Sequence, residues 1–229
     1  MKIEMHLHTK ESSHCGKVSA RDILPVYKQN GYGALVITDH FGRGALERWQ
    51  DLPYEKQVEN FLLGYRTAKQ EGDRLGLRVF LGAELRFEAD NNNNDYLVYG
   101  LTEEFFFSNP ELTQWRLKEF VAKKPPEALV YQAHPFRNGC CPMRREYLFG
   151  LEVFNGHGGH DNRNGLALQL ARMEHYHAIS GSDAHYEQYL CAGGLLTDQD
   201  VNSPQELLQV LTQDAYCLFN RNVTDKNHW

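Results

Sequence analysis

Residues 1–9, Met-Lys-Ile-Glu-Met-His-Leu-His-Thr, decide the fold, because a segment with strand character ends there in two histidines two positions apart. Successive side chains of a strand alternate between its faces, so His6 and His8 share one face. Active sites of parallel α/β folds form at the carboxyl ends of the strands. We therefore expect five strands to bring His or carboxylate side chains to one rim. The other four strand ends are Thr38-Asp39-His40, Gly82-Ala83-Glu84, Ala133-His134-Pro135 and Ser182-Asp183-Ala184-His185.

Seven segments have strand character, and most are short apolar runs, which suit strands buried on both faces. These segments are residues 1–6, 34–39, 78–87, 96–101, 128–134, 151–155 and 178–182. Segments with helical spacing lie between them: one that Ser19 opens, residues 54–75, one that follows Asn109-Pro110 and runs to Lys123-Lys124, and residues 161–176 and 205–214. This alternation implies βαβ units and a mainly parallel sheet. The number of units favours a closed barrel, with an open doubly wound sheet as the competing topology.

Length and composition favour a single domain that spans residues 1–229, with residues 91–94 as a loop tip between two strands. No apolar run approaches the roughly 20 residues of a membrane helix. The N-terminus lacks the apolar stretch of a signal peptide, and five Cys without a CxxC pair argue against a disulfide framework. We expect a cytoplasmic protein. A net charge of -6 without a Lys/Arg block argues against binding of long nucleic acid. The oligomeric state stays open.

The gathering of ionisable residues at one rim favours a metal site. A lone histidine or aspartate at a strand end is more often structural, and an isolated HxH pair is weak evidence. Burying many such groups together without a metal would cost several kcal/mol per unpaired charge. Imidazole is also the commonest side-chain ligand, and the chain has 11 His.

The ordered motifs HLHT, ITDH, GAE, AHP and SDAH, from His6 to His185, resemble those of the PHP superfamily, named for its polymerase and histidinol phosphatase members. The resemblance implies a distorted seven-stranded (β/α)7 TIM-like barrel. It also implies two or three divalent metal ions, usually zinc, manganese or iron. The implied activity is hydrolysis of phosphate esters by a hydroxide that bridges metal ions.

The resemblance further implies a set of metal ligands, in which one carboxylate bridges two ions. The segment SSHCG places a histidine where many family members carry Asp, as in histidinol phosphatase-like members, and this favours a third, His-rich site. Catalysis is expected to depend on Glu84, Asp183 and His185. The implied ligands are His6, His8, Glu84 and Asp183 for the first ion, Glu84 and His134 for the second, and His14, His40 and His185 for the third.

One departure from the family pattern concerns the second ion. Family members often carry a further histidine on the fourth strand, but the segment NDYLVYGL has none. The aligned position is Leu97. Asp95, two residues away on the same face, is a candidate substitute and equally a candidate turn residue after the Asn run. We expect the second ion to be weaker, exchangeable or differently bound.

Further polar residues near the motifs are candidates to support the ligands or to bind substrate. Asp39 and Glu152 are expected to orient metal-bound histidines. A guanidinium group holds two phosphate oxygens at once, although surface Arg are usually only solvated. Candidate substrate or phosphate contacts are Arg43, Arg137, Asn155, His157 and His160, with Arg163 a weaker one. No function is expected of His175, His177 and His228.

These observations predict a metal-dependent phosphoesterase that acts on a small phosphomonoester. Histidinol phosphate is a specific candidate because of His14. The alternatives are a phosphodiesterase or exonuclease on nucleotides or oligonucleotides, a phosphotyrosine phosphatase, and a non-catalytic metal-binding PHP domain. Retention of nearly every ligand position argues against the last alternative, and the missing histidine on the fourth strand argues mildly for it.

Overall fold

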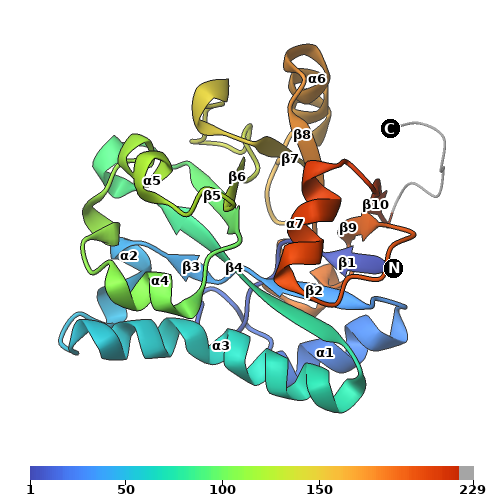
Figure 1. Ribbon diagram of the computed structural model, residues 1–229, viewed down its shortest axis with the longest axis horizontal. Coiled ribbons are helices and arrows are strands. Elements are labelled where there is room, and N and C mark those ends of the chain that lie inside the picture. The colour runs from blue at the N-terminus through green and yellow to red at the C-terminus, as the bar shows by residue number, and fades with distance from the viewer. Residues whose placement is uncertain (222–229) are drawn as a thin grey trace.

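The computed structural model describes residues 1–221, which form a strongly curved mixed sheet with helices on its outer face (Figure 1). All seven predicted strands are present: β1 (Lys2–Glu4), β2 (Ala34–Ile37), β4 (Arg78–Arg86), β5 (Asp95–Tyr99), β6 (Leu129–Gln132), β7 (Gly150–Asn155) and β8 (His177–Gly181). Three further strands were not predicted: β3 (His40–Phe41), β9 (Gly193–Leu196) and β10 (Cys217–Asn220). His228 lies outside the described residues.

The sheet is nearly closed into a barrel. Its strand order is β10-β9-β1-β2-β4-β5-β6-β7-β8, and β3 pairs with β4 beside this path. Leu7, which follows β1, forms a parallel bridge with Ala184, which follows β8. The backbone N–H of Asp183 also donates to the carbonyl of His6 at 2.8 Å. We call this contact of residues 6–7 with residues 183–184 the seam. It confirms the predicted barrel over the doubly wound sheet.

Strand β5 runs antiparallel to both of its neighbours, β4 and β6, whereas a mainly parallel sheet was expected. The connection from β4 to β5 explains the difference. It consists of residues 87–94 with one 3-10 turn, Glu88–Asp90, and a parallel crossover needs a dozen or more residues. The N-terminal end of β5 therefore reaches the rim, where Asp95 pairs with Arg86.

Four predicted helices are present: α1 (Ala20–Gln29), α3 (Tyr54–Leu75), α6 (Asn164–Glu174) and α7 (Pro204–Thr212). The Ser19 side chain caps α1, as its spacing from Asp22 indicates. The helix predicted to follow Asn109-Pro110 is wrong as one element. The chain there forms a 3-10 turn (Leu112–Gln114) and α5 (Leu117–Lys123), because Trp115 and Arg116 between them have extended backbone. A further helix, α4 (Glu103–Ser108), was not predicted, and it ends just before Asn109, the residue that Pro110 restricts. A short helix, α2 (Arg43–Leu46), was not predicted.

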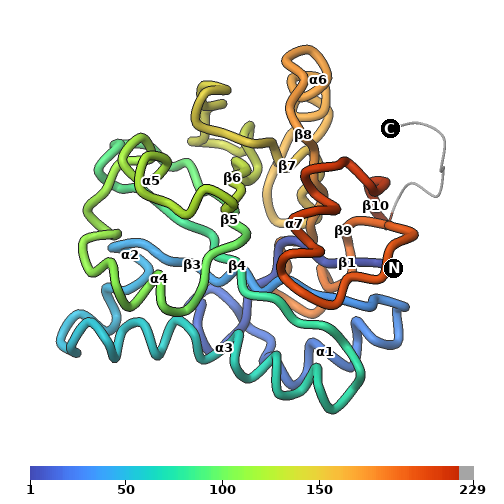
Figure 2. Tube along the Cα trace, viewed as in Figure 1, coloured from blue at the N-terminus to red at the C-terminus, as the bar shows by residue number. Residues whose placement is uncertain are grey.

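The end of the barrel interior away from the rim is apolar and covered. Gly100 follows the end of β5 that points away from Asp95, and a Cβ added to it would lie 3.0 Å from Leu208 of α7. Helix α7 therefore covers this end, while α1 and α3 lie side by side on the outer face of the sheet (Figure 2). No helix within residues 1–221 is both long and apolar enough to cross a membrane. The interior cluster includes Ile3, Val36, Phe80, Leu97, Tyr99, Ile179, Leu207, Val210 and Leu211.

Candidate metal centre

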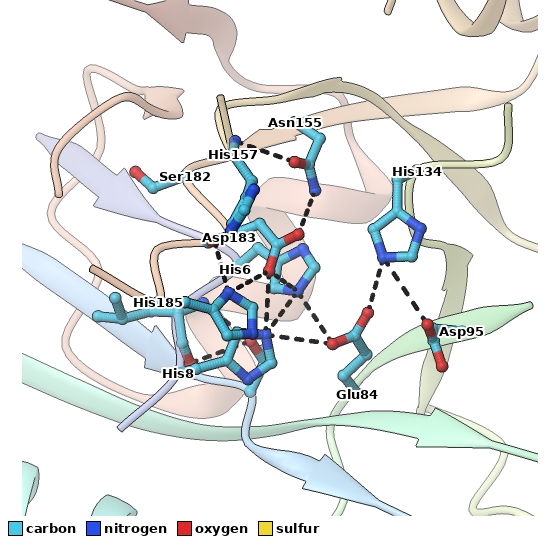
Figure 3. Close-up of polar contacts among 12 residues, drawn as sticks. His6, His8, Glu84, Asp95, His134, Asn155, His157, Ser182, Asp183 and His185 are labelled. Carbon is cyan, nitrogen blue, oxygen red and sulfur yellow. Dashed lines mark hydrogen bonds and ion pairs between the residues drawn. The ribbon is translucent and has the colours of Figure 1, made fainter. Parts of the chain in front are cut away.

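Four buried side chains converge at the rim, and we call them the central group: His6, His8, Glu84 and Asp183 (Figure 3). The two histidines follow β1, Glu84 lies in β4 and Asp183 follows β8. Asp183 Oδ1 lies 3.3 Å from His6 Nε2 and 3.2 Å from His8 Nε2. Glu84 Oε2 lies 3.3 and 3.1 Å from the same two nitrogens. Four potential ligand atoms therefore surround one point.

The hydrogen bonds behind the two imidazoles decide which nitrogens face this point. His6 Nδ1 lies 2.8 Å from Glu152 Oε1, a carboxylate oxygen that only accepts. His8 Nδ1 lies 3.3 Å from Ser13 Oγ, and that hydroxyl donates to Asp39 Oδ1 at 2.6 Å. Each imidazole therefore donates its Nδ1 proton outward, so in its neutral form it presents an Nε2 lone pair inward.

This arrangement suits a bound cation. The two Nε2 atoms are only 3.1 Å apart. Within the described residues, Glu84 Oε2 and Asp183 Oδ1 are buried atoms without a hydrogen-bond partner. Four acceptors facing one another repel unless a positive charge lies between them. Two imidazole nitrogens and two carboxylate oxygens are a donor set that fits zinc, manganese or iron.

The pKa shifts in the central group have the same electrostatic cause. Burial lowers the pKa of His8, but the adjacent carboxylates of Asp183 and Glu84 outweigh burial and raise it to about 9. Burial also lowers the pKa of His6, and the charges of Asp183, Glu152 and Glu84 together raise it well above its usual value. Burial raises the pKa of both carboxyl groups, yet the neighbouring imidazoles hold each one well below its usual range. Protons and metal ions therefore compete for the same nitrogens.

A second group consists of three imidazoles, those of His8, His40 and His185. The ring centroid of His8 lies 4.4 Å from that of His40 and 4.3 Å from that of His185. His40 Nδ1 lies 3.0 Å from Glu84 Oε2, so this carboxylate faces both groups. Burial and the charge of His8 lower the pKa of His185 to about 4, which leaves a neutral ligand at neutral pH. His14, implied as a ligand here, is exposed in the cavity wall, and His8 takes its place in the group.

His134 lies on the other side of Glu84 and faces Asp95. Its Nε2 is 3.0 Å from Glu84 Oε1 and 3.9 Å from Asp95 Oδ2. Its φ of 28° lies in the left-handed region, as does the φ of 47° at Asp183. A residue other than glycine held in that region usually marks a functional constraint. His134 therefore extends the cluster of polar groups at the rim.

Asp95 is a buried strand residue rather than a turn residue. Arg86 donates to both of its carboxylate oxygens, each at 2.6 Å, and Arg137 donates to Oδ2 at 3.0 Å. Leu97 pairs with Glu84 across β4 and β5 and is buried in the apolar interior. The sequence reasoning missed Arg86, although a strand period of two places it on the same face as Glu84.

Glu152, Asn155 and Asp39 lie behind the ligands. Glu152 Oε2 accepts from the His134 backbone N–H and from Asn155 Nδ2, both at 2.9 Å. Asn155 Nδ2 also lies 3.0 Å from Asp183 Oδ2. Asn155, a candidate substrate contact, is buried and absent from the cavity wall, so its position suits orientation of Asp183. Asp39 acts on the ligands through Ser13, which the sequence reasoning did not single out.

The ligand groups open into a cavity of about 920 Å³. His157 lines this cavity, and its ring centroid lies 4.7 Å from the ring centroids of both His160 and Tyr189. Arg43 and Arg163 do not line it. Arg43 lines a separate cavity of about 400 Å³, and exposed Arg163 pairs with Asp161. The walls include His14, Lys17, Arg86, Arg137, His157, His160, Tyr186 and Tyr189.

The family follows from a comparison of the sequence with family models. A model described as PHP domain matches residues 4–218, which include the central group and the seam. The chain belongs to the PHP family. A search of the curated proteins finds no match.

Solved structures share the PHP fold with this chain at low sequence identity. A two-domain protein from Bacteroides vulgatus, described as containing a predicted PHP-like metal-dependent phosphoesterase, is 16% identical with a TM-score of 0.59, over 96% of this chain and 64% of that protein. A candidate metal-dependent phosphoesterase from Bifidobacterium adolescentis is 15% identical, with a TM-score of 0.51. The match covers 92% of this chain and 96% of that protein. An amidohydrolase from Chromobacterium violaceum, with bound sulfate and no metal, is 14% identical, with a TM-score of 0.52. The match covers 96% of this chain and 98% of that protein.

Proposed function

We propose that this PHP protein is a metal-dependent phosphoesterase that hydrolyses a small phosphomonoester. The observation that carries the proposal is the convergence of Glu84 Oε2 and Asp183 Oδ1 on the Nε2 atoms of His6 and His8, at the base of a cavity. The guanidinium groups of Arg86 and Arg137 in the cavity wall supply positive charge for a phosphate. The descriptions of the Bacteroides and Bifidobacterium proteins agree with this reaction class.

A divalent ion held by the central group would polarise phosphoryl oxygens and lower the pKa of a coordinated water molecule toward neutrality. The residues of the chain hold the site in shape for this chemistry. Glu152 fixes the tautomer of His6, Ser13 fixes that of His8, and Asn155 orients Asp183. Donors fixed before the substrate arrives need no rearrangement as negative charge develops.

His157 is placed to serve the leaving group. Its Nδ1 accepts from the backbone N–H of Gly159 at 3.1 Å, so in the neutral ring the proton is on Nε2. Burial lowers the pKa of His157, which keeps the ring neutral at physiological pH. A neutral imidazole in the cavity wall donates a hydrogen bond to a leaving oxygen through Nε2–H.

The cavity favours a small substrate with a planar group. Its volume of about 920 Å³ lies within the range of small-molecule sites. His157 stacks on His160 and lies at a tilt to Tyr189, and these rings form an aromatic wall beside the ligands, which suits histidinol phosphate or a nucleoside phosphate. Because all five cysteines are unpaired, we place this activity in the reducing cytoplasm.

The test uses the full chain, stripped with chelator and reloaded with Mn²⁺ or Zn²⁺. The panel contains p-nitrophenyl phosphate, histidinol phosphate, nucleoside monophosphates, phosphotyrosine and the diester bis(p-nitrophenyl) phosphate. We expect hydrolysis of monoesters that chelator abolishes, and a loss of about 100-fold or more in kcat/KM for Asp183→Asn. Faster diester turnover would favour the phosphodiesterase, and a folded, metal-loaded protein without turnover would favour the non-catalytic domain.

A further inference from the structure

The space between His134 Nε2, Glu84 Oε1 and Asp95 Oδ2, which we call the second position, has an unusual set of neighbours. The resemblance to the PHP family implies a metal ion there. Each side of this space belongs to a buried residue, so a dication would depend on ligands from the chain. The question is how many of the surrounding atoms are free to coordinate one.

Asp95 is not free. It is fully buried, and both of its carboxylate oxygens accept hydrogen bonds from Arg86 in a bidentate contact of 2.6 and 2.6 Å. A third hydrogen bond, of 3.0 Å, comes from Arg137. Guanidinium groups stay protonated at every relevant pH. A dication bound to the same carboxylate would lie close to two permanent cations, and both would repel it.

The fourth strand supplies no replacement. Leu97 stands opposite Glu84 in the β4–β5 register, so its side chain lies on the same face of the sheet. It is a buried aliphatic side chain in the apolar interior and carries no ligand atom. His134 and Glu84 remain as the free ligands of this set, and protein zinc sites use three or four ligands from the chain. His40, Glu84 and Asp95 also lie close enough together to hold an ion, but that group depends on the same carboxylate that accepts from both arginines. While Asp95 holds Arg86 and Arg137, the second position therefore does not fit a metal ion.

We propose that Arg86 and Arg137, held by Asp95, take the place of a second-position metal ion and bind the phosphate group of the substrate. Two guanidinium charges equal the charge of one dication. Among the described residues, no hydrogen bond occupies Nη1 of Arg86, or Nε and Nη1 of Arg137, and both side chains line the cavity. The assignment of the phosphate to a substrate rests on the proposed function, whereas the replacement of the ion does not.

The first experiment counts metal ions and needs no activity. The full chain is loaded with excess Mn²⁺ or Zn²⁺, freed of unbound metal by gel filtration and analysed by elemental mass spectrometry. We expect no more than two ions per chain, held by the central group and the His8, His40 and His185 group. Three tightly bound ions per chain would overturn the replacement, whether or not the protein hydrolyses any ester.

The second experiment measures inorganic phosphate binding to the metal-loaded protein by calorimetry. Arg86→Gln and Arg137→Gln should each weaken binding by about tenfold or more, because each removes a charge-assisted hydrogen bond, without lowering the metal count. Arg78→Gln is the matched control, since Arg78 lies at the other end of β4 and pairs with Asn202. Unchanged phosphate affinity in both folded variants would overturn the phosphate role. Phosphate binding without hydrolysis of any ester would support this inference while the proposed function fails.

Discussion

At the scale of single residues, the sequence identifies the atoms that converge but not all of those that hold them. A strand period of two predicts that His6 and His8 share a face, and the structure brings both to the central group. Ser13 was missed because its role depends on a hydrogen-bond relay between His8 and Asp39. Spacing along a strand does not encode such a relay across a turn.

Ser13 provides a test of the central group that does not remove a ligand. Ser13→Ala removes the acceptor of the His8 Nδ1 proton, which frees the ring to rotate and to change tautomer. We expect metal affinity to fall by about tenfold or more, measured by calorimetric titration with Zn²⁺. Ser19→Ala, which removes the cap of α1, should lower stability by about 1 kcal/mol and leave metal affinity unchanged. Equal affinities of Ser13→Ala and wild type would exclude the relay.

The raised pKa of His8 predicts that metal-stripped protein loses stability as the pH rises. Folding raises this pKa from 6.5 to about 9, so the folded chain binds more protons than the unfolded chain between these values. The stabilisation is complete below about pH 6.5 and is lost as the pH rises through about 9. Burial lowers the pKa of His134, but its contact with Glu84 and its proximity to Cys140 raise it to about 10, so it acts in the same direction.

Thermal unfolding in EDTA at pH 6.5, 8 and 9.5 checks this sign, and Tm should fall along the series. Metal-loaded protein should not show this fall, because deprotonated imidazoles are the form that binds metal. His40 and His185, whose pKa values burial lowers, act below pH 6.5 and leave the window unaffected. A Tm of stripped protein that rises from pH 6.5 to 9.5 would contradict the assignment.

At the scale of elements, the chain's periodicity predicts which strands exist better than it predicts their direction. Helix α3 was predicted at its observed bounds, Tyr54–Leu75, from its helical spacing, and the structure shows Gly76 ending it in the left-handed conformation. The reversal of β5 depends on the length of one connection, β9 depends on pairing with β1, and β10 depends on pairing with β9. Strand direction and edge pairing are set by tertiary contacts that local patterns do not contain.

Gly64 fixes how closely α3 approaches the site. A Cβ there would lie 1.9 Å from Thr9 Oγ1 and 2.6 Å from Asp39 Oδ2, so Gly64→Ala must displace α3 or the turn that holds Ser13. We expect a loss of about 2 kcal/mol or more in chemical denaturation, although alanine favours helix formation. Gly165→Ala in α6 is the control, since nothing lies within 4 Å of its Cβ position. It should be neutral or add up to about 1 kcal/mol. Equal effects of the two substitutions would show that α3 tolerates the added methyl group.

At the scale of the whole molecule, the metal centre and the closure of the barrel are one structure. His6 lies on one side of the seam and Asp183 on the other, and the backbone hydrogen bond between them is part of the closure. A cation bound to both side chains would therefore link the end of β1 to the end of β8. We therefore expect metal binding and folding to be coupled through this link.

Removal of metal should accordingly lower global stability rather than affect only a local loop. With free metal at about 1,000 times Kd, the folded state gains about 4 kcal/mol, so EDTA should lower Tm by several degrees. For Asp183→Asn, EDTA should lower Tm by a much smaller amount, because this substitution weakens metal binding across the seam. The measurement is differential scanning calorimetry with and without chelator, and an equal Tm in both conditions for wild type would show that metal and closure are independent.

The seam also sets an order of events during protein synthesis. The ribosome releases His6 and His8 first, but the carboxylate across the seam emerges only after β8 has been translated. A nascent chain therefore presents two imidazoles without Asp183, and tight capture of an ion waits until nearly the whole barrel has left the exit tunnel. We therefore expect fragments that end before β8 to lack Asp183 and to bind metal weakly.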